Sequence, residues 1–121
     1  MATILLVEDN ESLRLAYTSF LQQAGFEVTA VSSGADALTY LESNTPDLLL
    51  VDMLMPRMNG LEFLKKYDLH GHPEVKAIAF SNLSEPKIEL EAKSLGAKLY
   101  VVKSLTTPDE LIENIKYVLA N

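Results

Sequence analysis

The fold prediction rests on the stretch LLLVDMLMPRMNG, Leu48–Gly60, which begins as an apolar run and changes character at Asp52. A short continuous apolar run such as Leu48–Val51 is typical of a strand that is buried on both faces of a parallel sheet. Pro56 and Gly60 then favour a loop that leads into a helix. An aspartate at such a strand end can cap a loop or take part in chemistry, and the rest of the chain decides between these roles.

Four further apolar runs lie along the chain, and segments with helical spacing separate them. With Leu48–Val51 they make five runs, the others being Ile4–Val7, Val28–Val31, Ala77–Phe80 and Leu99–Val102. Apolar residues spaced three and four apart predict helices over Leu13–Ala24, Gly34–Ser43, Asn59–Leu69, Ser84–Leu95 and Thr107–Leu119. This (βα)5 alternation predicts an α/β fold, a flavodoxin-like doubly wound parallel sheet of strand order 2-1-3-4-5 with helices on both faces. We expect one domain over residues 1–121 and no output domain in this chain.

Composition narrows the function classes. The chain has 10 Lys and Arg against 17 Asp and Glu, a net charge of −7, which argues against a nucleic-acid surface. There are no cysteines, which excludes disulfides, thiolate metal sites and a cysteine nucleophile. No apolar run approaches the length of a membrane span, and the N-terminus lacks a secretory pattern. We therefore expect a cytoplasmic protein with no membrane contact.

Polar and charged side chains follow the ends of four predicted strands. Glu8 and Asp9 follow the first strand, Asp52 the third, Ser81 the fourth and Lys103 the fifth. In this strand order the first and third strands are neighbours at the topological switch point, where ligands bind. Three ionised carboxylates about 5 Å apart repel one another by roughly 3 kcal/mol per pair at an effective dielectric near 20. A hard divalent cation would offset this, and Mg²⁺ prefers oxygen ligands.

With Mg²⁺ at the site, a phosphoryl group becomes the natural substrate. Asp52 could act as the nucleophile and form an aspartyl phosphate, which needs no general base because a carboxylate is already deprotonated. Lys103 and the Ser81 hydroxyl would hold the phosphoryl oxygens. Which of Glu8 and Asp9 contacts the metal directly, and which acts through water, stays open.

The motifs together resemble those of response-regulator receiver domains, the phosphoacceptor modules of two-component signalling. LLVEDN supplies the acidic pair, LLLVDMLMPRMNG the acceptor Asp52, AIAFSN the switch residue Ser81, and LYVVKS the aromatic switch residue Tyr100 with Lys103. The resemblance implies Mg²⁺ or Mn²⁺ bound by Glu8, Asp9, Asp52 and the backbone carbonyl of Leu54. A histidine kinase, a phosphotransfer protein or a small phosphodonor would supply the phosphoryl group to Asp52.

The resemblance also implies how the signal leaves the domain. Phosphorylation would draw Ser81 inward, turn Tyr100 and change the surface of the fourth helix, fifth strand and fifth helix toward a downstream partner. The chain would catalyse its own phosphorylation and dephosphorylation rather than act as a turnover enzyme, as a monomer for which a phosphorylation-dependent dimer stays open. Leu90 is an exposed apolar candidate for partner contact, because it falls opposite the apolar stripe of its helix.

Four positions depart from the pattern of the family. Ser104 follows Lys103 where the family usually has a proline, and we expect a trans peptide bond there because a non-proline cis bond is costly. Asn82 is larger than the usual small residue after Ser81 and would restrict access to the site. Leu54 and Leu83 cannot hydrogen-bond an attacking water, which predicts a long-lived phosphoryl group.

Three alternative functions stay open at this point. A metal-dependent aspartyl-nucleophile phosphatase would usually carry a second acid at the position of Leu54. An FMN-binding flavodoxin-like protein would have a Ser-, Thr- and Gly-rich loop where this chain has Glu8 and Asp9. A degenerate receiver would serve only as a docking module. The pair His70 and His72 should lie at the opposite end of the sheet, where solvated loop histidines are commoner than metal ligands.

Overall fold

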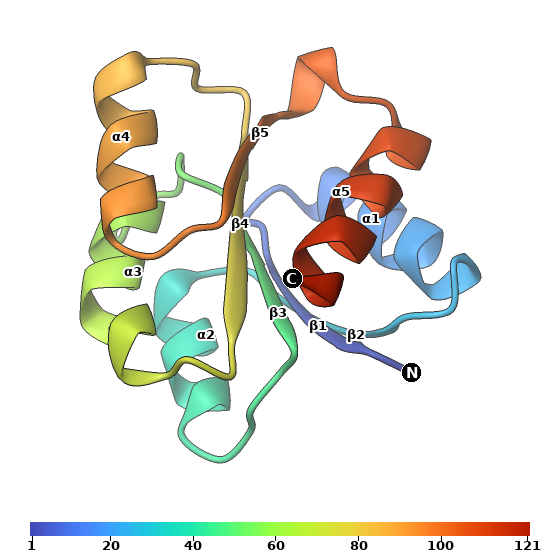
Figure 1. The fold of residues 1–121 in the computed structure, drawn as a ribbon, viewed down its shortest axis with the longest axis horizontal. Helices are drawn as coiled ribbons and strands as arrows, with labels where there is room; N and C mark the ends of the chain where they lie inside the picture. Colours follow the sequence, from blue (N-terminus) through green and yellow to red (C-terminus); the bar gives the residue numbers. More distant parts are fainter.

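The computed structural model describes residues 1–121 as one five-stranded parallel sheet, as predicted. Its strand order is β2-β1-β3-β4-β5, which confirms the doubly wound topology (Figure 1). The strands are β1 (Thr3–Val7), β2 (Glu27–Val31), β3 (Leu48–Val51), β4 (Lys76–Ser81) and β5 (Leu99–Val102). Each lies within one residue of the corresponding apolar run at either end.

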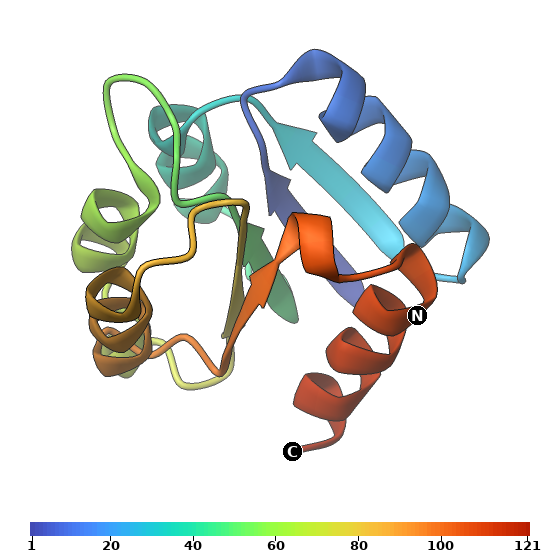
Figure 2. The same cartoon turned by 90° about the horizontal axis from the view of Figure 1, so that it is seen from above.

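Helices cover both faces of the sheet, again as predicted. Figures 1 and 2 show α2, α3 and α4 on one side of the sheet and α1 and α5 on the other. The helices are α1 (Glu11–Gln23), α2 (Gly34–Leu41), α3 (Gly60–Tyr67), α4 (Pro86–Ser94) and α5 (Pro108–Ala120). Two short 3-10 turns, η1 (Leu69–Gly71) and η2 (Lys103–Leu105), complete the chain. None of the helices is both long and apolar enough to cross a bilayer.

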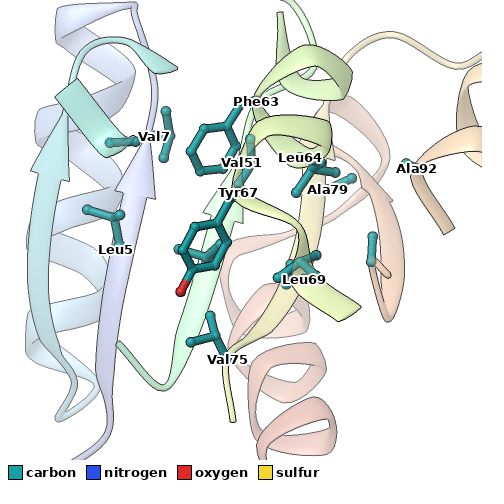
Figure 3. Close-up of a cluster of buried hydrophobic side chains, with 14 of the residues drawn as sticks. Leu5, Val7, Val51, Phe63, Leu64, Tyr67, Leu69, Val75, Ala79 and Ala92 are labelled. Carbon is teal, nitrogen blue, oxygen red and sulfur yellow. The ribbon is translucent and has the colours of Figure 1, made fainter. Parts of the chain in front are cut away.

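The sheet divides the core into two clusters, which explains why β3 is apolar at every position. Leu49 and Val51 belong to the cluster under α2, α3 and α4, whereas Leu48 and Leu50 belong to the cluster under α1 and α5. Figure 3 shows the first cluster, in which Val51 lies beside Phe63 of α3. Because successive strand residues point to opposite faces, a strand covered on both sides needs an apolar residue at every position.

The expectations for the edge strands and for two helix ends need correction. The runs Val28–Val31 and Leu99–Val102 are typical of strands buried on both faces, but β2 and β5 are the edge strands and most of their residues are exposed or half-buried. The helix expected from Ser84 begins at Pro86, because proline fits the first turn, where its missing N–H has no partner to lose. The helix expected to reach Leu69 ends at Tyr67, since Asp68 takes a left-handed conformation with φ 58°.

Two helix ends follow simple sequence rules, and the expected trans peptide bond is confirmed. Gly25 follows α1 with φ 98°, a conformation that glycine adopts without a side-chain clash and that ends helices. Thr107 and Glu110 form a capping box at the start of α5, a pattern of a hydroxyl residue followed three positions later by glutamate. The Lys103–Ser104 peptide bond is trans, because the chain contains no cis peptide bond.

Candidate functional site

The topology brings the predicted site residues to the carboxyl edge of the sheet. Glu8 follows β1, Asp52 follows β3, Ser81 is the last residue of β4 and Lys103 follows β5. These four side chains are the buried polar and charged residues of the chain, with exposed fractions of 9 % or less. Burial of ionisable groups is unfavourable unless they are paired or bind a cation. The burial of these side chains therefore lowers the folding stability at this edge of the sheet.

Three carboxylates come together there. One oxygen each of Glu8, Asp9 and Asp52 lies within 4.8 Å of the other two. Glu8 and Asp52 are buried, with exposed fractions of 2 % and 7 %, whereas Asp9 is exposed. The donor set consists of carboxylate oxygens open to solvent on one side, which fits a hard divalent cation that keeps some of its water.

Lys103 connects the two buried carboxylates. Its ammonium forms ion pairs with Glu8 Oε1 and with Asp52 Oδ2, the latter at 3.1 Å. It also lies 5.4 Å from the centre of the Phe80 ring. Burial alone lowers the pKa of Lys103, but the hydrogen bond to Glu8 and the charge of Asp52 outweigh it and leave that pKa raised. Lys103 therefore stays charged at neutral pH.

Burial has the opposite consequence for Glu8. It raises the pKa of this carboxyl group, and the hydrogen bond from Lys103 opposes the effect only in part. One ammonium thus incompletely compensates two buried carboxylates that also face Asp9. The site retains an excess of negative charge that a bound cation would neutralise.

The loop after β3 contains the second half of the stretch Leu48–Gly60, and backbone contacts account for its residues. The backbone N–H of Leu54 donates to Asp52 Oδ1 at 3.0 Å, and the N–H of Gly60 donates to the Met53 carbonyl at 3.2 Å. A Cβ atom at Gly60 would lie 2.5 Å from the Asp52 carbonyl oxygen. Only glycine therefore allows α3 to begin against the backbone of Asp52. The side chain of Leu54 is 55 % exposed.

Asn10 and Arg14, for which the sequence predicted no role at the site, hold the acidic loop after β1. Arg14 of α1 donates to the backbone carbonyls of Glu8 at 3.0 Å and of Asp9 at 3.3 Å. Asn10 caps α1 through its side chain, and its N–H donates to Glu8 Oε2 at 3.1 Å. Asparagine before a helical segment is a known capping signal, whereas nothing in the sequence pattern marks Arg14.

Ser81, at the end of β4, is not hydrogen-bonded to the carboxylates or the ammonium of the predicted site. Ser81 is fully buried, but its Oγ accepts from the Leu83 N–H at 3.2 Å and forms no hydrogen bond with Asp52 or Lys103. The hydroxyl of Tyr100 donates to the Leu83 carbonyl at 2.6 Å, and burial raises the pKa of this phenol. Leu83 thus links the two predicted switch residues.

The remaining candidates lie away from this edge. His70 and His72, expected at the opposite end, lie on either side of Gly71 in the connection between α3 and β4 and contact backbone carbonyls, those of Ser94 and Asp68 respectively. The His72 ring also stacks on Tyr67, with ring centres 4.2 Å apart. Leu90 is 69 % exposed on α4, which confirms the exposure expected for it.

Comparison with known families gives a match over almost the whole chain. The model of the response regulator receiver domain matches residues 4–116. Among curated proteins, the phosphate regulon transcriptional regulatory protein PhoB of Rhizobium meliloti is 33 % identical over 119 residues, covering 96 % of this chain and 51 % of PhoB. The chain thus spans about half the length of PhoB, and less of some other relatives, such as the sensor kinase CqsS of Vibrio cholerae.

Solved structures agree with this match. Chemotaxis protein CheY4 of Vibrio cholerae aligns with a TM-score of 0.89 and 29 % identity, covering 98 % of each chain. Response regulator protein TrrA of Thermotoga maritima, solved in complex with Mg²⁺ and BeF, aligns with a TM-score of 0.86 and 31 % identity. That alignment covers 98 % of this chain and 99 % of TrrA.

Proposed function

Because the chain belongs to the response regulator receiver family, we propose that it is a signalling switch in which Asp52 accepts a phosphoryl group. The observation that carries this proposal is the contact of Asp52 with Lys103 at the topological switch point, within 4.8 Å of the carboxylates of Glu8 and Asp9. Burying a carboxylate next to two others destabilises the folded state, and such destabilising arrangements of ionisable groups are typical of functional sites.

Receiver domains bind Mg²⁺, and the donor set of this chain fits that ion. We propose that Glu8, Asp9, Asp52 and the Leu54 carbonyl hold Mg²⁺, and that Mn²⁺ can replace it. When bound, the cation neutralises negative charge on the carboxylates and on the phosphoryl oxygens. TrrA, a related structure, was solved in complex with Mg²⁺ and BeF, which supports a metal and a phosphoryl mimic as ligands of this chain.

The reaction itself requires little from the protein beyond positioning. A lone pair of an Asp52 carboxylate oxygen forms the bond to phosphorus, and the bond from phosphorus to the donor's leaving group breaks with its electron pair. Hydrogen bonds from Leu54 N–H and Lys103 fix the two carboxylate oxygens of Asp52 before attack. Lys103, which stays protonated, can then follow the developing charge on the phosphoryl oxygens.

We also propose where the phosphoryl group comes from and which surface transmits the signal. We propose a histidine kinase, a phosphotransfer protein or a small phosphodonor as the source, and a cytoplasmic setting for residues 1–121 as a single receiver domain. Ser81 and Tyr100 would transmit the change to the surface of α4, β5 and α5, where Leu90 offers an apolar contact to an unknown partner.

Phosphorylation should depend strictly on a divalent cation. Acetyl phosphate with Mg²⁺ is expected to add the mass of one phosphoryl group to the intact chain, and Mn²⁺ should support the same reaction. An excess of EDTA should reduce the initial rate by more than about a hundredfold, because the phosphoryl oxygens would then meet three carboxylates whose charge Lys103 alone compensates incompletely. Intact-mass spectrometry over time measures both rates.

The same preparation separates the alternatives. Labelling that is equally fast in EDTA would contradict the metal site, and no labelling under any condition would favour a docking module. Continued hydrolysis of a generic phosphomonoester over many turnovers would favour the phosphatase. A yellow protein with flavin absorbance would favour the flavodoxin-like alternative.

Leu54 is expected to set the lifetime of the phosphoryl group. Its exposed side chain stands two residues after Asp52 and cannot orient a water molecule. Leu54→Asn adds a hydrogen-bonding group there and should accelerate dephosphorylation by about two- to tenfold, the range of one hydrogen bond. The measurement is the decay of the labelled mass after the donor is removed.

Leu15→Asn provides the matched control, because Leu15 is a similarly exposed leucine, 62 % against 55 %, on α1. Its decay rate should equal that of the wild type. An unchanged decay rate in Leu54→Asn would show that this position does not control hydrolysis.

A further inference from the structure

We propose that Asn82 is a positioning residue that ties the strand end carrying Ser81 to the turn carrying Lys103. The backbone N–H of Ser104 donates to Asn82 Oδ1 at 2.8 Å. Asn82 directly follows Ser81, and Ser104 directly follows Lys103, so one hydrogen bond joins the neighbours of two proposed phosphoryl-binding residues. The inference rests on the proposed function, since only a phosphorylated Asp52 gives this connection a consequence for signalling.

Two departures from the usual family pattern thus explain each other. A proline after Lys103 would have no N–H and could not form this bond. Ser104 lies in the short turn η2 (Lys103–Leu105), whose first N–H groups have no partner within the turn. The Asn82 side chain supplies the missing acceptor, whereas an alanine or glycine at this position could not. Asn82, which we expected only to restrict access, therefore has a second and specific contact.

The bond adds to two others that hold the same short segment. Leu83, the next residue, donates its N–H to Ser81 Oγ and accepts from the Tyr100 hydroxyl. In this arrangement the Ser81 oxygen is engaged by its own loop and not by Asp52 or Lys103. The Ser81 O–H stays free to donate, but the side chain forms no hydrogen bond with Asp52 or Lys103, so the switch proposed for Ser81 includes a movement of the segment Ser81–Leu83 toward Asp52. The Asn82–Ser104 bond opposes that movement and stabilises the resting arrangement.

Loss of the bond should therefore shift the domain toward the state that binds a phosphoryl group. A change that destabilises only the resting state raises the apparent affinity for any ligand of the other state by the same factor. One exposed hydrogen bond corresponds to a factor of about two to ten. An increase in affinity is the diagnostic result, because a mutation that simply damaged the site would lower the affinity.

The first test measures the bond itself and does not depend on the proposed function. Amide hydrogen exchange of Ser104, followed by NMR, should be about two- to tenfold faster in Asn82→Ala and Asn82→Leu than in the wild type. Asn82→Asp keeps an acceptor oxygen and should restore the protection. Ser104→Ala removes only the hydroxyl and should also leave it unchanged. Equal exchange in all five proteins would overturn the proposed contact.

The second test measures its consequence. Beryllofluoride with Mg²⁺ should bind Asn82→Ala and Asn82→Leu about two- to tenfold more tightly than the wild type or Ser104→Ala. Leucine has the same number and branching of side-chain heavy atoms as asparagine and is no smaller, so it separates the lost bond from easier access to the site. Wild-type affinity in Asn82→Leu, or weaker binding in both variants, would overturn the positioning role. If the wild type binds no beryllofluoride, the proposed phosphoacceptor function fails. If the wild type binds it and all variants bind it equally well, the Asn82–Ser104 bond does not stabilise the resting state.

Discussion

Replacement of Asp52 by asparagine is expected to abolish phosphorylation by acetyl phosphate and Mg²⁺. The amide keeps the size of the side chain and can still accept from the Leu54 N–H. It lacks the anionic oxygen that attacks phosphorus, and removal of a covalent nucleophile commonly lowers rates by several orders of magnitude. The initial rate of mass increase should therefore fall by more than about a hundredfold.

Asp68→Asn is the matched control for this variant. Asp68 undergoes the same chemical change at the opposite end of the sheet, where its left-handed backbone also suits asparagine. Its labelling rate should equal that of the wild type. A label of wild-type extent on Asp52→Asn, wherever it is attached, would show that another residue is the acceptor.

The fold could be predicted because sheet topology leaves few choices for this sequence. The central run Leu48–Val51 is buried on both faces, so its apolar character reports its environment directly. The edge strands β2 and β5 are the exceptions, since most of their apolar residues are only half-buried without any change of composition. Helix ends were predicted less well, because Pro86 and Asp68 fix them through backbone geometry rather than through hydrophobic periodicity.

The sequence predicted which residues gather at the site, but it did not predict all of their hydrogen-bond partners. Parallel strands place their carboxyl ends at one edge, so Glu8, Asp52 and Lys103 had to lie close together once the strand order was assumed. The partner of the Ser81 hydroxyl and the bond between Asn82 and Ser104 depend on loop paths and side-chain rotamers. No periodicity or spacing in a single sequence encodes those.

Replacement of Lys103 by methionine should destabilise the fold strongly in the absence of metal. Methionine matches the length of the buried stem but leaves Glu8 and Asp52 without the ammonium that pairs both. Breaking a buried ion pair from one side costs about 3–5 kcal/mol, because the remaining charge stays buried. Because burial raises the pKa of Glu8, the deficit should shrink as the pH falls and this carboxyl group takes up a proton. Urea unfolding in EDTA at neutral and mildly acidic pH measures the effect.

Mg²⁺ distinguishes a lost charge from a damaged core in this variant. A divalent cation held by the carboxylates takes over the role of the ammonium, so saturating Mg²⁺ should stabilise Lys103→Met more than it stabilises the wild type. Lys93→Met is the matched control, since Lys93 forms an exposed pair with Glu89 on α4 and should change the unfolding free energy by less than about 1 kcal/mol. If Mg²⁺ stabilised Lys103→Met and the wild type equally, the loss would come from packing around the lysine stem. Lys103 would then not be the charge that compensates the acidic site.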